Sequence, residues 1–130
     1  MIKDTNVIVF DIDGTLCYSR KEGQSYLDIE PMQDVLDKLL EYHANGFYII
    51  LQTARQMRTH EGNVGRINAV TGKELFAWLE KFDIPFDEVH FGKPWCGKNG
   101  FYVDDKAIRP NEFVNLSFDE IQELISTDSQ

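Results

Sequence analysis

The stretch "VFDIDGTL" (Val9–Leu16) joins an apolar run to two acids and a glycine. The run itself, Asn6–Ile12, is nearly continuous in apolar residues, which predicts a buried strand of a parallel sheet. That strand ends in Asp11 and Asp13, whose carboxylates stand one residue apart and repel each other unless a cation compensates them. The stretch therefore indicates a functional site at the end of a strand.

Size and composition are those of one globular domain, predicted to span residues 1–130. The chain has 130 residues, of which 42% are hydrophobic and 27% charged, enough to bury a core. No apolar run approaches the ~20 residues that span a membrane. The net charge of −9 disfavours nucleic acid and anionic membranes as partners.

The amino terminus and the cysteines indicate a cytoplasmic protein. The first residues lack the basic and apolar regions of a secretory signal. Cys17 and Cys96 lie far apart, without a CxxC pair or a Cys/His cluster at ligand spacing. We therefore expect both thiols to be reduced, and neither a disulfide nor a zinc site.

Apolar patterning alternates between strands and helices along the chain. The predicted strands are Asn6–Ile12, Phe47–Gln52, Glu88–Phe91 and Gly100–Val103. The predicted helices are Pro31–His43, Thr71–Phe82 and Ser117–Ile125. This order predicts an α/β fold of Rossmann-like, three-layer form, a parallel sheet flanked by helices on both faces.

Three local signals support these helices. Asn45 and Gly46 follow the first helix as a C-cap, and Ser117 with Glu120 has the spacing of a capping box. In the second helix we expect five residues to face the core: Leu75, Phe76, Trp78, Leu79 and Phe82.

Polar residues follow each predicted strand, and parallel strands end at the same edge of their sheet. These residues are Asp11 and Asp13, Thr53 and Arg55, Lys93, and Asp104 with Asp105. Ligands of open α/β sheets bind beyond the carboxyl ends of the strands. The sequence therefore predicts that these side chains converge on one site.

The chemistry of this set points to phosphoryl transfer. Several carboxylates need a hard cation, and Mg²⁺ suits a site with carboxylates, waters and a substrate phosphate. Lys93 and Thr53 would hold the phosphate by charge and by a hydroxyl donor. Asp11 could attack phosphorus as a nucleophile. Asp13 could protonate the leaving oxygen and then deprotonate the attacking water.

The motifs resemble those of haloacid dehalogenase-like (HAD) phosphatases over almost the whole chain. "DIDGTL" (Asp11–Leu16) is similar to the DxDGT motif, Thr53 to the second motif, Lys93 to the third and "VDD" (Val103–Asp105) to the fourth. The resemblance implies four metal-binding positions, which are Asp11 as nucleophile and ligand, Asp13 through its carbonyl, Asp104, and Asp105 as ligand or neighbour.

Three longer stretches resemble a bacterial subgroup of capsule polysaccharide biosynthesis phosphatases. They are "TARQMRTHEGNVGRIN" (Thr53–Asn68), "GKPWCGKNGFYVDD" (Gly92–Asp105) and "AIRP" (Ala107–Pro110). This resemblance implies a sugar or polyol phosphate as substrate, in capsule or surface polysaccharide biosynthesis.

The spacing of the motifs leaves no room for a substantial cap domain, since neither insert reaches the ~50 residues of a small domain. We expect the loops Cys17–Leu27 and Gln56–Val70, or a second subunit of a homo-oligomer, to shield the site. Arg55, Arg58, His60 and Asn63 are candidates for binding the substrate, and Trp95 for stacking on a sugar ring.

Each residue also has a plainer interpretation. Asp11 to Gly14 could form only an Asx turn, Thr53 could bond the backbone, and Asp104 and Asp105 could cap a turn. Arg55 and Arg58 could be solvated surface charges, and Trp95 could serve packing. Cys17 is expected to be a small buried filler.

Other functions stay open at this level. The same fold could serve a nucleic-acid end phosphatase or nucleotide phosphatase, which an open site suits but the negative charge opposes. A phosphotransferase, or a phosphate-binding module without activity, are further alternatives.

Overall fold

The computed structural model describes residues 6–127, and the chain folds into two compact units, Met1–Trp95 and Cys96–Gln130. The first unit carries all the strands that the described residues form. The second carries two short helices. The mixed α/β class predicted from the sequence is confirmed.

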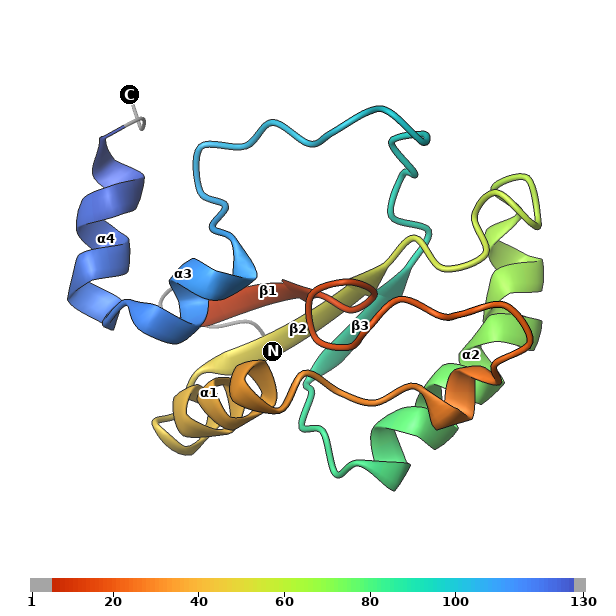
Figure 1. Ribbon diagram of the computed structural model, residues 1–130, viewed down its shortest axis with the longest axis horizontal. Helices are drawn as coiled ribbons and strands as arrows, with labels where there is room; N and C mark the ends of the chain where they lie inside the picture. Colours follow the sequence, from red (N-terminus) through yellow and green to blue (C-terminus); the bar gives the residue numbers. More distant parts are fainter. Residues whose placement is uncertain (1–5, 128–130) are drawn as a thin grey trace. The chain divides into compact units, whose positions relative to one another are not determined.

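A three-stranded parallel sheet forms the centre of the first unit (Figure 1). Its strands are β1 (Val7–Asp11), β2 (Tyr48–Thr53) and β3 (Glu88–Phe91), in the order β1-β2-β3. The register aligns Asp11 with Gln52, and Thr53 with Phe91. The first three predicted strands are thus confirmed, and their carboxyl ends meet at one edge.

Two helices connect these strands, α1 (Gln33–Ala44) and α2 (Val64–Lys81). Asn45 ends α1 as its C-cap, and Gly46 follows with a positive φ, as predicted. The second helix begins two turns earlier than predicted, because Asn63 caps it by accepting a hydrogen bond from the Arg66 amide at 3.1 Å. Within residues 6–127, no helix has the length and apolarity to cross a membrane.

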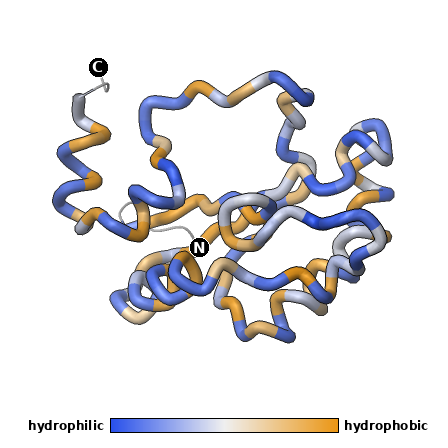
Figure 2. Tube along the Cα trace, viewed as in Figure 1, coloured by the Kyte–Doolittle hydropathy of each residue, from blue (hydrophilic) through white to orange (hydrophobic). Residues whose placement is uncertain are grey.

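The buried face of the sheet follows from side-chain alternation. Phe10, Ile49 and Leu51 share one face and are almost fully buried, and the hydropathy colouring is apolar along β1 and β2 (Figure 2). Val9 lies on the other face and is 55% exposed. The expectation of a fully buried β1 was therefore wrong on that face. The structure supports a parallel sheet flanked by helices, and the three-layer HAD-like arrangement stays a prediction.

In α2, the core position of Trp78 is confirmed and that of Phe76 is wrong. Trp78 is fully buried and donates a hydrogen bond from Nε1 to the Ile29 carbonyl at 2.8 Å. Phe76 is 45% exposed, because it lies on the flank of the helix beside Phe86 and Phe91 rather than in the interior.

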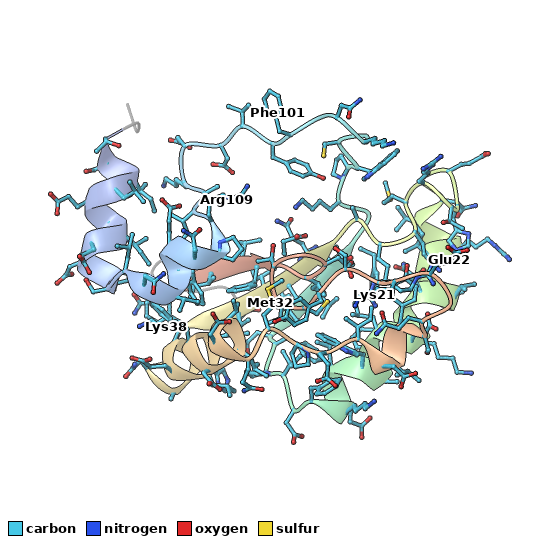
Figure 3. The ribbon with its side chains drawn as sticks, viewed as in Figure 1. Lys21, Glu22, Met32, Lys38, Phe101 and Arg109 are labelled. Atoms are coloured by element: carbon cyan, nitrogen blue, oxygen red, sulfur yellow. The ribbon has the colours of Figure 1, made fainter. Side chains whose placement is uncertain are left out.

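The second unit contains α3 (Pro110–Asn115) and α4 (Phe118–Ser126). The predicted capping box of Ser117 and Glu120 is present. Gly100–Val103, predicted as a strand, is not one. Its side chains are exposed, and that of Phe101 projects from the long loop (Figure 3). A short apolar segment forms a strand when it finds a strand to pair with, and among the described residues the sheet consists of β1, β2 and β3 without this segment.

Candidate functional site

The candidate site lies where the three strands of the first unit end. Asp11 closes β1, Thr53 closes β2, and Lys93 stands two residues beyond β3. The Lys93 amide donates a hydrogen bond to the Thr53 carbonyl at 3.1 Å. That bond fixes the start of the Lys93 loop against β2, so residues from three distant parts of the sequence meet at one edge.

Asp11 is held between a cation and a hydroxyl group. Lys93 Nζ lies 3.2 Å from one carboxylate oxygen, and Thr15 Oγ1 donates to the other at 3.2 Å. Thr15 reaches back because the chain turns tightly after β1, with Gly14 at φ +80°. Thr15 was not selected from the sequence, although its place at the end of the DxDGT motif was a usable signal.

Asp13 has more contacts than Asp11, with Thr53 at the end of β2 and with Arg55 two residues beyond it. Arg55 Nη2 lies 2.8 Å from Oδ1, and Arg55 Nε lies 3.3 Å from Oδ2. Thr53 Oγ1 donates to Oδ2 at 3.2 Å. Such two-point guanidinium contacts are stronger and more directional than single neutral hydrogen bonds. They fix both the position and the rotation of the Asp13 carboxylate.

Thr53 links the Asp13 carboxylate to the backbone at Arg55. Its side chain is 1% exposed, and its hydroxyl oxygen accepts a hydrogen bond from the Arg55 amide at 2.9 Å. The plainer interpretation of Thr53 as a strand-end hydroxyl that bonds the backbone is thus correct. The same hydroxyl also belongs to the site, because it donates to Asp13.

Arg55 is buried, so the alternative of a solvated surface charge is wrong. The residue is 4% exposed, and its guanidinium carbon lies 4.3 Å from the centre of the Tyr26 ring. Nη1 has no hydrogen-bond partner among the described residues. Tyr26 was missed in the sequence, where nothing marks it as a neighbour of a residue 29 positions away.

Cys17 is the small buried filler expected from the sequence. It is fully buried, and its Sγ lies 3.9 Å from Asp13 Oδ1. Burial, and next the negative charge of Asp13, raise the pKa of the Cys17 thiol to about 12. This thiol is therefore protonated and unreactive at neutral pH.

Arg58 and Trp95 form a second pair near the Lys93 loop. The Arg58 guanidinium lies 5.4 Å from the centre of the Trp95 ring, within the range of a cation–π contact. Trp95 is 47% exposed. The Trp95 ring thus packs against a cation and also keeps accessible surface, so the structure agrees with both interpretations of Trp95, packing and stacking on a substrate.

Asp104 and Asp105 belong to the second unit, so their predicted meeting with Asp11 stays a prediction. Asp104 Oδ1 accepts a hydrogen bond from the Lys106 amide at 2.8 Å, the geometry of an Asx turn. Across residues 6–127, no three His, Cys, Asp or Glu side chains gather as a metal-binding group. In the first unit, the predicted metal-binding atoms are a carboxylate oxygen of Asp11 and the backbone carbonyl oxygen of Asp13.

The fold and the site define an α/β protein with two carboxylates and two cationic side chains at the carboxyl ends of parallel strands. A crystal structure of an MCSG target from Vibrio cholerae is similar to it, with 44% sequence identity and a TM-score of 0.90. The match covers 96% of this chain and 100% of the other. The chain therefore belongs to the family of that Vibrio cholerae protein, whose name states no activity. No family model and no curated protein matches the chain.

Proposed function

We propose that this protein is a Mg²⁺-dependent phosphomonoester hydrolase of the HAD type, acting in the cytoplasm through an aspartyl-phosphate on Asp11. The observation that carries the proposal is the approach of Lys93 Nζ to Asp11 Oδ1 at 3.2 Å across 82 residues of sequence. A carboxylate that faces a lysine at the end of a parallel strand has the neighbour that an incoming phosphate needs. The order of the four sequence motifs supports the same assignment.

The residues of the site fit a magnesium ion. Asp11 and Asp13 supply hard carboxylate and carbonyl oxygens, and Mg²⁺ commonly binds through one or two carboxylates with the substrate phosphate. Asp104 and Asp105 are the proposed remaining ligands or neighbours. When bound, the ion would neutralise charge on the phosphoryl oxygens and on the paired acids.

In the first half of the reaction, an Asp11 carboxylate oxygen forms a bond to phosphorus and the bond from phosphorus to the ester oxygen breaks. Asp13, in its protonated form, gives its proton to that leaving oxygen, so an alcohol departs. Lys93 and the Thr53 hydroxyl bind the phosphoryl oxygens as negative charge is redistributed.

In the second half, water attacks phosphorus of the aspartyl-phosphate. Asp13, now ionised, accepts the proton of that water, and the bond between Asp11 and phosphorus breaks to release inorganic phosphate. Both acids return to their starting forms. The closeness of Thr53 to Asp13, 3.2 Å between Oγ1 and Oδ2, supports a site that brings acid and phosphate-binding groups together.

We propose a sugar or polyol phosphate as substrate, from capsule or surface polysaccharide biosynthesis. The resemblance of Thr53–Asn68 and Gly92–Asp105 to capsule polysaccharide phosphatases supports this class. The exposed ring of Trp95 beside Arg58 supports it too, since an aromatic face and a cation suit a hydroxylated ring that carries phosphate. The net charge of −9 opposes a nucleic-acid substrate.

The test is a phosphate-release screen over sugar, polyol and nucleotide monophosphates, with Mg²⁺ or with EDTA. Asp11→Asn keeps the shape of the side chain and removes the nucleophile. The matched control is Asp37→Asn, an exposed acid on α1 that bonds Gln33. The proposal predicts that the chelator and Asp11→Asn abolish release and that Asp37→Asn does not. Release that survives both would reject the mechanism, and a preference for nucleotides would reject the substrate class.

A further inference from the structure

The loop between β1 and α1 passes close to the site and is fastened to α2. Its 3-10 turn, η1 (Tyr26–Asp28), is capped by the Ser25 hydroxyl, which accepts a hydrogen bond from the Leu27 amide at 3.2 Å. Lys81 Nζ donates to the Leu27 carbonyl at 2.9 Å, and Trp78 bonds the Ile29 carbonyl. The turn that carries Tyr26 is therefore capped locally at its start and bonded to α2 just after Tyr26.

Tyr26 covers the guanidinium of Arg55. The Arg55 carbon Cζ lies 4.3 Å from the centre of the ring, closer than the 5.2 Å of Arg20 to the same ring. A guanidinium stacked on an aromatic face is attracted by the ring and shielded from water. The Arg55 side chain is 1% exposed for this reason, while the Asp13 side chain beneath it is 32% exposed.

The backbone on the far side of Arg55 is also fixed. Gln56 has φ +59°, a conformation that non-glycine residues seldom adopt without support from their surroundings. Its side-chain oxygen accepts a hydrogen bond from the buried Thr71 hydroxyl of α2 and lies 3.2 Å from His60 Nε2. Arg55 is thus held by its neighbour in sequence as well as by Tyr26.

We propose that Tyr26 and Arg55 are positioning residues, which hold the Asp13 carboxylate in the orientation that proton transfer to the leaving group needs. This inference rests on the proposed function. It differs from the expectation that Arg55 binds the substrate, because Nε and Nη2 are both directed to Asp13. Proton transfer requires a heavy-atom approach near hydrogen-bond length, so a carboxylate that rotates freely transfers protons less efficiently.

Leaving-group dependence separates positioning from a general structural role. A polyol alkoxide leaves poorly unless it receives a proton, whereas p-nitrophenolate is a stable anion that leaves without one. A variant that misplaces Asp13 should therefore lose kcat/KM, which covers the steps up to departure of the alcohol, for the alkyl phosphate and keep it for p-nitrophenyl phosphate. Its kcat should not discriminate in this way, because Asp13 also accepts the proton of the attacking water for both substrates. A variant that damages the fold should lose both.

The experiment compares kcat and KM for glycerol 3-phosphate, or the best alkyl phosphate of the screen, with those for p-nitrophenyl phosphate. Tyr26→Ala should lower kcat/KM for the alkyl phosphate about 10- to 100-fold, a fraction of the ~10²–10⁴-fold that a general acid supplies, with less than about threefold change in kcat/KM for the aryl phosphate. Tyr26→Phe keeps the aromatic face and should stay near wild type. Arg55→Lys keeps the charge without the two-point contact and should follow Tyr26→Ala.

Leu40→Ala is the control, since Leu40 lies on α1, outside the loops that are expected to shield the site, and is 40% exposed. It should leave both substrates unchanged. Equal losses of kcat/KM for both substrates in Tyr26→Ala and Arg55→Lys, or no loss for either, would overturn the positioning role while the hydrolase itself stands. A wild-type protein that hydrolyses neither substrate would overturn the proposed function, and the positioning role with it.

Discussion

Replacement of Trp78 by phenylalanine tests how the loop of the site is anchored to the core. Trp78 is fully buried, and its Nε1 donates to the carbonyl of Ile29, which is itself 1% exposed. Phenylalanine retains an aromatic ring but has no donor. The Ile29 carbonyl then loses its partner in a place that water does not reach.

The cost has two parts. Leaving a buried acceptor without its hydrogen bond costs about 1–3 kcal/mol. The space left by the smaller ring adds about 1 kcal/mol, because the surroundings collapse incompletely around it. The free energy of unfolding should therefore fall by about 2–4 kcal/mol, a large share of the ~5–15 kcal/mol typical of a domain.

Urea unfolding followed by far-UV circular dichroism measures this loss. With a slope of about 1–3 kcal/mol per molar for a chain of this size, the midpoint should fall by about 0.7–4 M. Trp95→Phe is the matched control, since Trp95 is 47% exposed and exposed substitutions change stability by less than about 0.5 kcal/mol. If Trp78→Phe shifts the midpoint no more than Trp95→Phe does, the buried hydrogen bond does not anchor the loop.

Three further predictions concern other parts of the chain. At pH 8, iodoacetamide should label Cys96, which is partly exposed, and should not label Cys17, which is fully buried. Mass spectrometry of the native and the urea-unfolded protein measures the labelling of each cysteine. Fast labelling of Cys17 in the native protein would contradict its burial. A hydrogen bond from His90, and to a lesser extent one from Tyr48, lowers the pKa of Glu88. The contribution of Glu88 to stability is therefore present above the ordinary glutamate pKa and is lost as the pH falls through the lowered pKa. Unfolding midpoints measured from pH 6 to pH 3 should fall less steeply in Glu88→Gln, and identical slopes would refute the linkage. Ser117→Ala removes the cap of α4 and should cost about 0.5–2 kcal/mol of local helix stability. Hydrogen exchange of the α4 amides measures this loss, with a variant that replaces an exposed serine elsewhere by alanine as the control. Unchanged exchange in Ser117→Ala would show that the cap is dispensable.

The sheet of the first unit could be predicted because its strands follow the simplest pattern. Short apolar runs between amphipathic helices marked β1, β2 and β3, with β3 correct at both ends. The same pattern was wrong for Gly100–Val103, since a run of apolar residues does not say whether a partner strand is available. The apolar pattern also failed to predict the exposure of Val9, because it does not show which face of a strand is packed against other elements.

The site was predictable in part for the same reason. Strand ends located Asp11, Asp13, Thr53 and Lys93, and the structure brings all four together. The burial of Arg55 could not be predicted, because it depends on Tyr26, a loop residue whose fold is set by hydrogen bonds to α2. Long-range contacts of a loop leave no periodic signal in the sequence.

The start of α2 was within reach of the sequence but was assigned wrongly. Asparagine is a common helix-capping residue and Asn63 precedes Val64, but the apolar periodicity that predicts this helix begins only at Thr71. The first two turns of α2 are largely exposed, so they carry little of the apolar periodicity from which the helix was recognised.

A crystal structure with magnesium and beryllofluoride, a mimic of the phosphoryl group, tests the central claim most directly. The account predicts beryllofluoride bonded to a carboxylate oxygen of Asp11, with Lys93 and Thr53 at hydrogen-bond distance and a magnesium ion shared with Asp13 and Asp104. Beryllofluoride on another carboxylate would contradict it. So would an Asp11 side chain without beryllofluoride in crystals of protein that releases phosphate in solution.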